Sequence, residues 1–284
     1  MSENVQQKTA SINDILKMVS RANETFVYEI YVPSLGKKLM FREINTSQQK
    51  RLIKSIIDSP AFQTEFIFAL RQIIKENCVD EGINVGSFNI FDKMVIAMTM
   101  RAMSISNDLD LQFQEDDNAT PIKIRINLKD LVDKAVKDIH VEPAIIKDDQ
   151  NVFEIMCSLP TIDDEFNLES ELRSNVKSIE IKGENELRQT VGEVFTNEIV
   201  KYIKQVNIKN KDTNEIIELD LKNLKFTDRL AILNKIPAKV NNKIIQYINS
   251  VNKEFEKILL FSQEKDGKKM EQRLRIDASF FTVS

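Results

Sequence analysis

The hydrophobic pattern of residues 24–106 changes once, from alternation to helical spacing, and this change limits the possible folds. Tyr28, Ile30 and Val32 fall on one face of an extended segment, and Leu39 and Phe41 do so on a second one. From residue 46 onward, apolar residues recur every three or four positions in three successive segments. The pattern predicts a β-hairpin followed by a three-helix cluster.

The connection Pro33-Ser34-Leu35-Gly36 has the chemistry of a tight turn, because proline fixes φ and glycine can adopt a positive φ. Gly36 and Lys37 also suggest a phosphate loop, which has the form G-x-x-x-x-G-K-[ST] between a strand and a helix. This chain has a single glycine there, Lys38 in place of the hydroxyl residue, and a strand afterwards. We therefore expect a turn and no nucleotide binding.

The three helices of the cluster follow directly. Their expected ranges are 46–59, 61–78 and 89–105. Thr46-Ser47-Gln48-Gln49 has the pattern of a capping box at the start of the first helix, which should end before Pro60. In the third helix Met100 and Met103 fall off the apolar stripe, so they are candidates for an adaptable contact surface.

Residues 106–121 are rich in carboxylates and end on a proline. A calcium loop would need the D-x-[DN]-x-[DN]-G spacing and a terminal glutamate, and neither the spacing nor the glycine is present. We therefore expect a solvated acidic connection, followed by strands within 121–128 and 150–160. Asp163-Asp164-Glu165 is expected in a loop.

The last third is predicted to be mainly helical. The expected elements are a helix over 184–206, a short strand over 214–221, two helices within 226–255 and a closing β-hairpin over 257–276. Pro237 should separate the two helices, with Asp228 near the start of the first. Asp266-Gly267 should lie in the turn of the hairpin.

Hairpins alternating with helices, without a run of βαβ units, favour an α+β fold. We expect an N-terminal β-hairpin with a three-helix cluster, a central strand-containing segment, and a helical C-terminal part closed by a β-hairpin. The expected organisation is an N-terminal arm or short helix over 1–22, a hairpin-plus-helices unit over 23–107, an acidic linker and strand segment over 108–170, and a helical unit with a terminal hairpin over 171–284.

The residues that usually carry catalysis or bind metals are scarce. His140 is the single histidine, Cys78 and Cys157 each stand alone, and the chain has 6 glycines. These numbers leave no zinc set, redox motif, nucleophile triad or glycine-rich cofactor loop. We assign no catalytic, cofactor-binding or metal residue. The enzymatic alternative is a hydrolase that uses carboxylates or His140.

Charge and hydropathy limit the classes of partner. The net charge is −4, whereas general nucleic-acid binders carry a basic excess. No segment approaches the roughly 18 apolar residues of a membrane span. We therefore expect neither nucleic-acid binding nor a membrane span. The first residues lack the basic and apolar regions of a secretory signal.

Two spaced patterns resemble a known family. Y-x-I-x-V-P-S-x-G-K-x-x-x-F-R begins at Tyr28, and F-D-K-x-x-x-x-x-x-x-R-x-x-S-I begins at Phe91. Together with the segment 226–248 and the closing hairpin, they resemble the baseplate hub subunit, or hub assembly, family of T-even-type contractile-tailed bacteriophages. The residues that carry the resemblance are Pro33, Ser34, Gly36, Lys37, Phe41, Arg42, Asp92, Arg101, Ser104, Asp228, Arg229 and Pro237. Where relatives have Cys-x-x-Cys in the last hairpin, this chain has Ser262-Gln263-Glu264-Lys265.

The resemblance implies a structural or assembly protein without catalysis, located in the virion tail baseplate or in the host cytoplasm during assembly. An alternative role is a chaperone that leaves before the virion matures. The implied partners are other baseplate hub or tail subunits, and a homo-oligomer is possible. Candidate interface residues, for which core packing is the alternative, are Ile12, Ile15, Leu16, Met100, Met103, Phe280 and Phe281.

Overall fold

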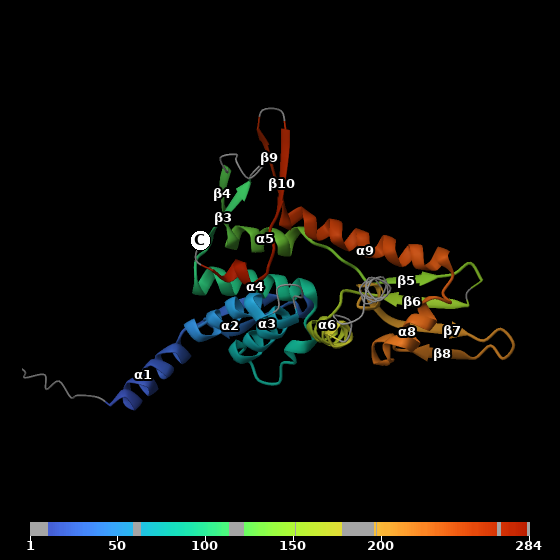
Figure 1. The fold of residues 1–284 in the computed structure, drawn as a ribbon, viewed down its shortest axis with the longest axis horizontal. Helices are drawn as coiled ribbons and strands as arrows, with labels where there is room; N and C mark the ends of the chain where they lie inside the picture. Colours follow the sequence, from blue (N-terminus) through green and yellow to red (C-terminus); the bar gives the residue numbers. More distant parts are fainter. Residues whose placement is uncertain are drawn as a thin grey trace, which may run out of the picture.

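The computed structural model (Figure 1) describes residues 11–58, 64–113, 122–150, 152–177, 196, 198–265 and 268–282. Helices and small antiparallel sheets alternate along the described chain, which confirms the predicted α+β class. Strands pair in the orders β1-β2, β3-β4, β5-β6-β7-β8 and β9-β10.

The N-terminal hairpin has the predicted strands and turn. Strand β1 (Val27–Val32) pairs with β2 (Lys37–Arg42), and Val27 lies opposite Arg42. A 3-10 turn over Pro33–Leu35 connects them, and Gly36 has φ 60°, a value that glycine adopts without a steric cost. The inward faces of the two strands are buried as expected.

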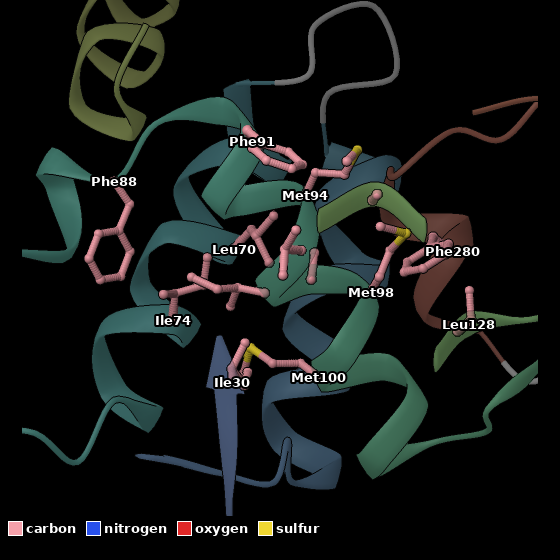
Figure 2. Close-up of a cluster of buried hydrophobic side chains, with 14 of the residues drawn as sticks. Ile30, Leu70, Ile74, Phe88, Phe91, Met94, Met98, Met100, Leu128 and Phe280 are labelled. Atoms are coloured by element: carbon pink, nitrogen blue, oxygen red, sulfur yellow. The ribbon is translucent and has the colours of Figure 1, made fainter. Parts of the chain in front are cut away.

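The three predicted helices follow, and α4 lies at the centre of the largest core. They are α2 (Thr46–Asp58), α3 (Thr64–Asn77) and α4 (Ile90–Ser104). Figure 2 shows that Ile30 of β1, Leu70 of α3 and Phe280 of the C-terminal segment lie around α4. Because α4 is enclosed on several sides, it has apolar residues nearly all round rather than a single stripe.

The start of α2 differs from the prediction by one residue. The Asn45 side chain accepts the backbone N–H of Gln48, and the Gln48 side chain accepts the backbone N–H of Asn45. The reciprocal bonds of a capping box are therefore made by Asn45 and Gln48, not by Thr46 and Gln49.

The carboxylate-rich segment is partly a strand, contrary to the prediction of a solvated connection. Residues Asp108–Phe113 form β3, which pairs with the predicted strand β4 (Ile122–Asn127). Arg125 donates from Nε to Oδ1 of Asp110 at 3.0 Å across the pair, so the strand accommodates its acidic residues. Helix α5 (Leu128–Asp138) follows at once and packs beside α4.

A four-stranded antiparallel sheet forms the second core. It contains β5 (Ala144–Lys147), β6 (Phe153–Cys157), β7 (Ile203–Lys209) and β8 (Ile216–Leu219). One face, with Ile155 and Val206, packs against Val240 and Ile244. The predicted helix over 184–206 falls mostly outside the described residues. Of its described part, residues 196 and 198–200 are helical, whereas residues 203–206 form the start of β7 instead.

Helix α6 (Ile162–Lys177) connects the two cores and begins where a loop was predicted. Thr161 and Asp164 exchange backbone-to-side-chain hydrogen bonds of 2.9 and 3.1 Å, a capping box at its first turn. Asp163, Asp164 and Glu165 therefore lie in the first turn, where the helix dipole favours negative charge.

The C-terminal part follows the prediction closely. Helices α8 (Phe226–Leu233) and α9 (Ala238–Leu259) are separated at Pro237, and α9 leads into the hairpin β9 (Leu260–Lys265) and β10 (Lys268–Arg273). The predicted turn residues 266–267 lie outside the described part. The chain then returns to α4 and ends in the short 3-10 helix η4 (Ala278–Phe281).

Candidate interaction surface

Helix α1 (Ile12–Thr25) projects away from the body of the molecule (Figure 1). Its first turn is capped by Ser11, whose Oγ accepts the backbone N–H of Asp14 at 3.2 Å. The helix leads into β1 through the single residue Phe26, so its direction is set by the hairpin. Ile12 is 75% exposed and Leu16 is 61% exposed.

Four of the exposed apolar residues of α1 form one face. Ile12, Ile15, Leu16 and Val19 recur at intervals of three and four residues, the spacing that places side chains on one side of a helix. Helices of fewer than about 12–15 residues are marginally stable in water, and tertiary packing of an amphipathic face usually supplies the rest. This face has no such packing in the described chain.

Exposed apolar side chains continue onto the hairpin. Phe26 and Val27 are exposed, and Val27 and Tyr31 lie on the face of β1 opposite the buried Ile30. Scattered single apolar residues are normal on protein surfaces, whereas a contiguous group marks an interaction site. We call Ile12, Ile15, Leu16 and Val19 the α1 apolar face and treat it as the candidate site.

The other predicted interface residues divide into two groups. Met100 is fully buried, and Phe280 and Phe281 pack into the main core, which favours the alternative of core packing for these three residues. Phe281 packs against Phe66 and Phe280. Met103 is exposed, as expected from its position off the stripe.

Asp92 ties the hairpin turn to α4. Its Oδ1 accepts the backbone N–H of Ser34 at 2.8 Å, and its Oδ2 accepts that of Asn89 at 2.9 Å. Asn89 accepts in return from the first turn of α4, which completes a capping box. Burial raises the pKa of the Asp92 carboxyl, and the N–H donors oppose that rise. Ser104, at the other end of α4, accepts the backbone N–H of Ile44.

Arg101 holds the C-terminal segment against α4. Its buried guanidinium donates to the carbonyl oxygens of Phe280 at 2.5 Å and Ser106 at 2.6 Å. The guanidinium carbon also lies 5.4 Å from the centre of the Phe280 ring. Burial lowers the pKa of Arg101. Arg101 therefore connects segments far apart in the chain.

Arg229 has a similar role in the second core. Its Nε donates to the Leu221 carbonyl at 3.1 Å, and its Nη2 donates to the Leu224 carbonyl and to Glu171 Oε2, both at 2.9 Å. The neighbouring Asp228 is exposed and lies in the first turn of α8, and Pro237 precedes α9.

The hairpin residues that the sequence singled out are also structural. Phe41 is fully buried, whereas Lys37 is exposed. Arg42 is partly buried, and its Nη1 donates to the Glu76 carbonyl at 3.5 Å. Pro33 and Gly36 shape the turn that Asp92 holds.

Groups suited to catalysis are dispersed in the described residues. No cluster of three or more His, Cys, Asp or Glu side chains that could hold a metal occurs among them. His140 is exposed, and Cys78 and Cys157 are free thiols. Burial raises the pKa of Cys157 to about 12, which keeps it protonated at neutral pH. None of the described helices has the length and apolarity to cross a bilayer.

The sequence did not reveal the roles of Arg101 and Arg229. An arginine within an apolar run is a signal of a buried cation, but its partners are backbone carbonyls, which the sequence does not distinguish. The exposed pair Ile216 and Ile217 on β8 was also missed, because two successive isoleucines are typical of a buried strand.

A family model described as T4 bacteriophage base plate protein matches residues 24–282. No curated protein and no solved structure matches significantly. The matched region begins at the last turn of α1, so the α1 apolar face lies outside it.

Proposed function

The chain belongs to the T4 bacteriophage base plate protein family, and on that premise we propose that it is a baseplate hub subunit of a contractile-tailed myophage. Membership of this family supports a structural role in the phage baseplate and contact with other tail proteins. The finer proposal is that the chain stays in the mature virion and acts through protein–protein contacts without catalysis.

The single observation that carries the proposal is the α1 apolar face. An amphipathic helix of 14 residues that projects from a folded body is suited to insertion into a groove of another protein. Anchors at Ile12, Ile15, Leu16 and Val19 match the i, i+3, i+4, i+7 spacing of such helices. Burial of these side chains in a partner would supply the packing that α1 lacks.

The rest of the described chain supports a permanent structural part of the virion rather than a transient chaperone. The buried side chains of Asp92, Arg101 and Arg229 hold turns and terminal segments through hydrogen bonds, and such networks favour a single rigid arrangement. Rigid surfaces with one projecting element suit an assembly in which each subunit keeps its place.

Incorporation into virions tests the proposal. A phage with a nonsense mutation in the gene is complemented with the wild-type chain or with Leu16→Asp, and purified particles are analysed by quantitative mass spectrometry. Asn13→Asp is the matched control, because it adds the same charge on another side of the exposed helix. We expect wild-type and control chains in mature tails, and a loss of at least tenfold for Leu16→Asp.

Two results would overturn the proposal. If the chain is present on assembly intermediates and absent from mature virions, it is a transient chaperone that works in the host cytoplasm. If Leu16→Asp is incorporated as well as the control, the α1 apolar face is not the contact. Circular dichroism of the purified variants shows whether the body of the protein stays folded.

A further inference from the structure

Two strands have an open edge and opposite charge. Strand β4 pairs only with β3 in its sheet, and β8 pairs only with β7, so within the described chain each has one unpaired side. An open strand edge can accept another strand through main-chain hydrogen bonds. β4 contains the exposed Lys123 and Arg125, and Arg125 is also paired with Asp110 of β3. β8 contains the exposed Glu218 directly after Ile216 and Ile217.

The unpaired backbone groups along the open edge of β4 belong to its basic residues. The Leu128 N–H donates to the Asn107 carbonyl at 2.8 Å, which fixes that pair as a hydrogen-bonded one. Because such pairs alternate along an antiparallel ladder, Lys123 and Arg125 direct their N–H and C=O groups away from β3.

The same reasoning applies to β8. The Asn210 N–H donates to the Glu215 carbonyl at 2.8 Å, in register with the β7–β8 ladder. Alternation then places the N–H and C=O groups of Ile216 and Glu218 on the open side of β8. Ile216 is 63% exposed and Ile217 is 52% exposed, and the strand contains no lysine or proline that would block pairing.

We propose that β4 of one copy of this chain pairs antiparallel with β8 of a second copy. Two antiparallel registers place the outward groups of Glu218 opposite a basic residue of β4. Glu218 pairs with Lys123 in one register and with Arg125 in the other. Opposite charges in such cross-strand positions stabilise a ladder, and like charges destabilise it.

Pairing of either strand with its own copy is less favourable. In a β4–β4 pair the outward residues Lys123 and Arg125 would face cations, and in a β8–β8 pair Glu218 would face Ile216 or another Glu218. Charge complementarity therefore selects the β4–β8 combination over both alternatives.

The two strands lie apart in the molecule, with β4 above α5 and β8 at the lower right of Figure 1. A contact between different surfaces of identical chains is heterologous, and it repeats into a ring or an open chain. Because β8 has 4 residues, the contact is far smaller than a standard interface. It is therefore expected to be weak in solution and to gain strength where several contacts form together.

Sedimentation velocity of the full chain tests the pairing. At concentrations up to about 1 mM, the range in which weak contacts form, we expect the sedimentation coefficient to rise with concentration and the rise to shrink in 0.5 M NaCl, which screens exposed charges. One variant carries Lys123→Glu with Arg125→Glu, and a second carries Glu215→Lys with Glu218→Lys.

Each reversed variant should stay monomeric alone, and an equimolar mixture of the two should associate, because each then offers the other complementary edges. Lys129→Glu with Lys134→Glu is the matched control, since it makes the same charge change on the adjacent helix α5. Ile216→Pro removes one outward N–H without breaking a β7–β8 bond and should also abolish association.

If the wild-type chain does not associate as its concentration rises, the proposal is overturned. This holds even if another baseplate protein binds to β8. So would association that persists in the reversed variants or in Ile216→Pro. A mixture of reversed variants that fails to associate, although both are folded by circular dichroism, would show that β4 and β8 are not partners.

Discussion

The guanidinium of Arg101 lies 2.5 Å from the carbonyl oxygen of Phe280, a residue 179 positions later in the chain. The same group donates to Ser106 and lies over the Phe280 ring. One side chain thus joins the end of α4, the start of β3 and the C-terminal segment. Arg101 is one of the residues that carry the sequence resemblance, and these contacts give it a structural role.

Replacing Arg101 by Met should destabilise the protein, because the buried carbonyl of Phe280 and the partly buried carbonyl of Ser106 would lose their donor. The expected loss in the free energy of unfolding is about 3 kcal/mol, since each unsatisfied buried group costs roughly 1–3 kcal/mol. Urea denaturation followed by circular dichroism measures it. Arg125→Met is the control, because Arg125 is exposed; equal losses for the two variants would contradict the assigned role.

Phe281→Ala separates core packing from partner contact. Phe281 is fully buried beside Phe66, so truncation should leave a cavity and cost about 3–5 kcal/mol. A residue held ready for a partner would change stability by less than about 0.5 kcal/mol. A change in the free energy of unfolding of that small size, measured by urea denaturation, would instead favour partner contact for Phe281.

The sequence predicted the positions of helices and strands better than it predicted which of their residues are exposed. Alternation in β1, β2 and β4 and the break at Pro237 indicated the correct elements, because these signals are local. The stripe argument failed for Met100, since it assumes that a helix has one face in water, and α4 is enclosed by segments distant in sequence. Strand β3 was missed because its carboxylates suggested a loop, although Leu109, Leu111 and Phe113 alternate.

The candidate site was predicted in part. The spacing of Ile12, Ile15 and Leu16 identified an amphipathic helix, but the spacing is the same for a helix that packs on its own domain. Only the direction of α1, set by its junction with β1, leaves this face uncovered in the described chain. Phe280 and Phe281 show the converse, because a terminal Phe-Phe pair is compatible with either a core or a contact.

The pH dependence of stability should contain a contribution from Asp92. Burial raises its folded-state pKa above the unfolded value, so the folded state binds the proton more tightly. Its contribution to stability is therefore full below the unfolded pKa, about 3.9, and is lost as pH rises through the folded pKa. The unfolding free energy of wild type minus that of Asp92→Asn should fall over this interval. Urea titrations from about pH 3.5 to 7 measure it; a difference that rises with pH would contradict the direction.

Cys157 should react with thiol reagents only when the protein unfolds. It is buried in β6, and burial raises its pKa to about 12, so its thiolate is scarce at neutral pH. In a Cys78→Ser background, modification by iodoacetamide at pH 8 should be negligible in buffer and complete in urea. Rapid modification of the native protein would show that the β5–β8 sheet opens more readily than its packing indicates.

Hydrogen exchange should distinguish α1 in the free chain from α1 in the assembled baseplate. In the free protein its amides are expected to exchange fast, because a helix of 14 residues with an uncovered apolar face opens readily. Those of α4 should exchange slowest, since α4 lies at the centre of the main core. When the chain is incorporated into baseplates, α1 should become strongly protected while α4 changes little. Mass spectrometry of peptides from both states measures this; an α1 already protected in the free chain, or unprotected in the baseplate, would contradict the proposed insertion into a partner.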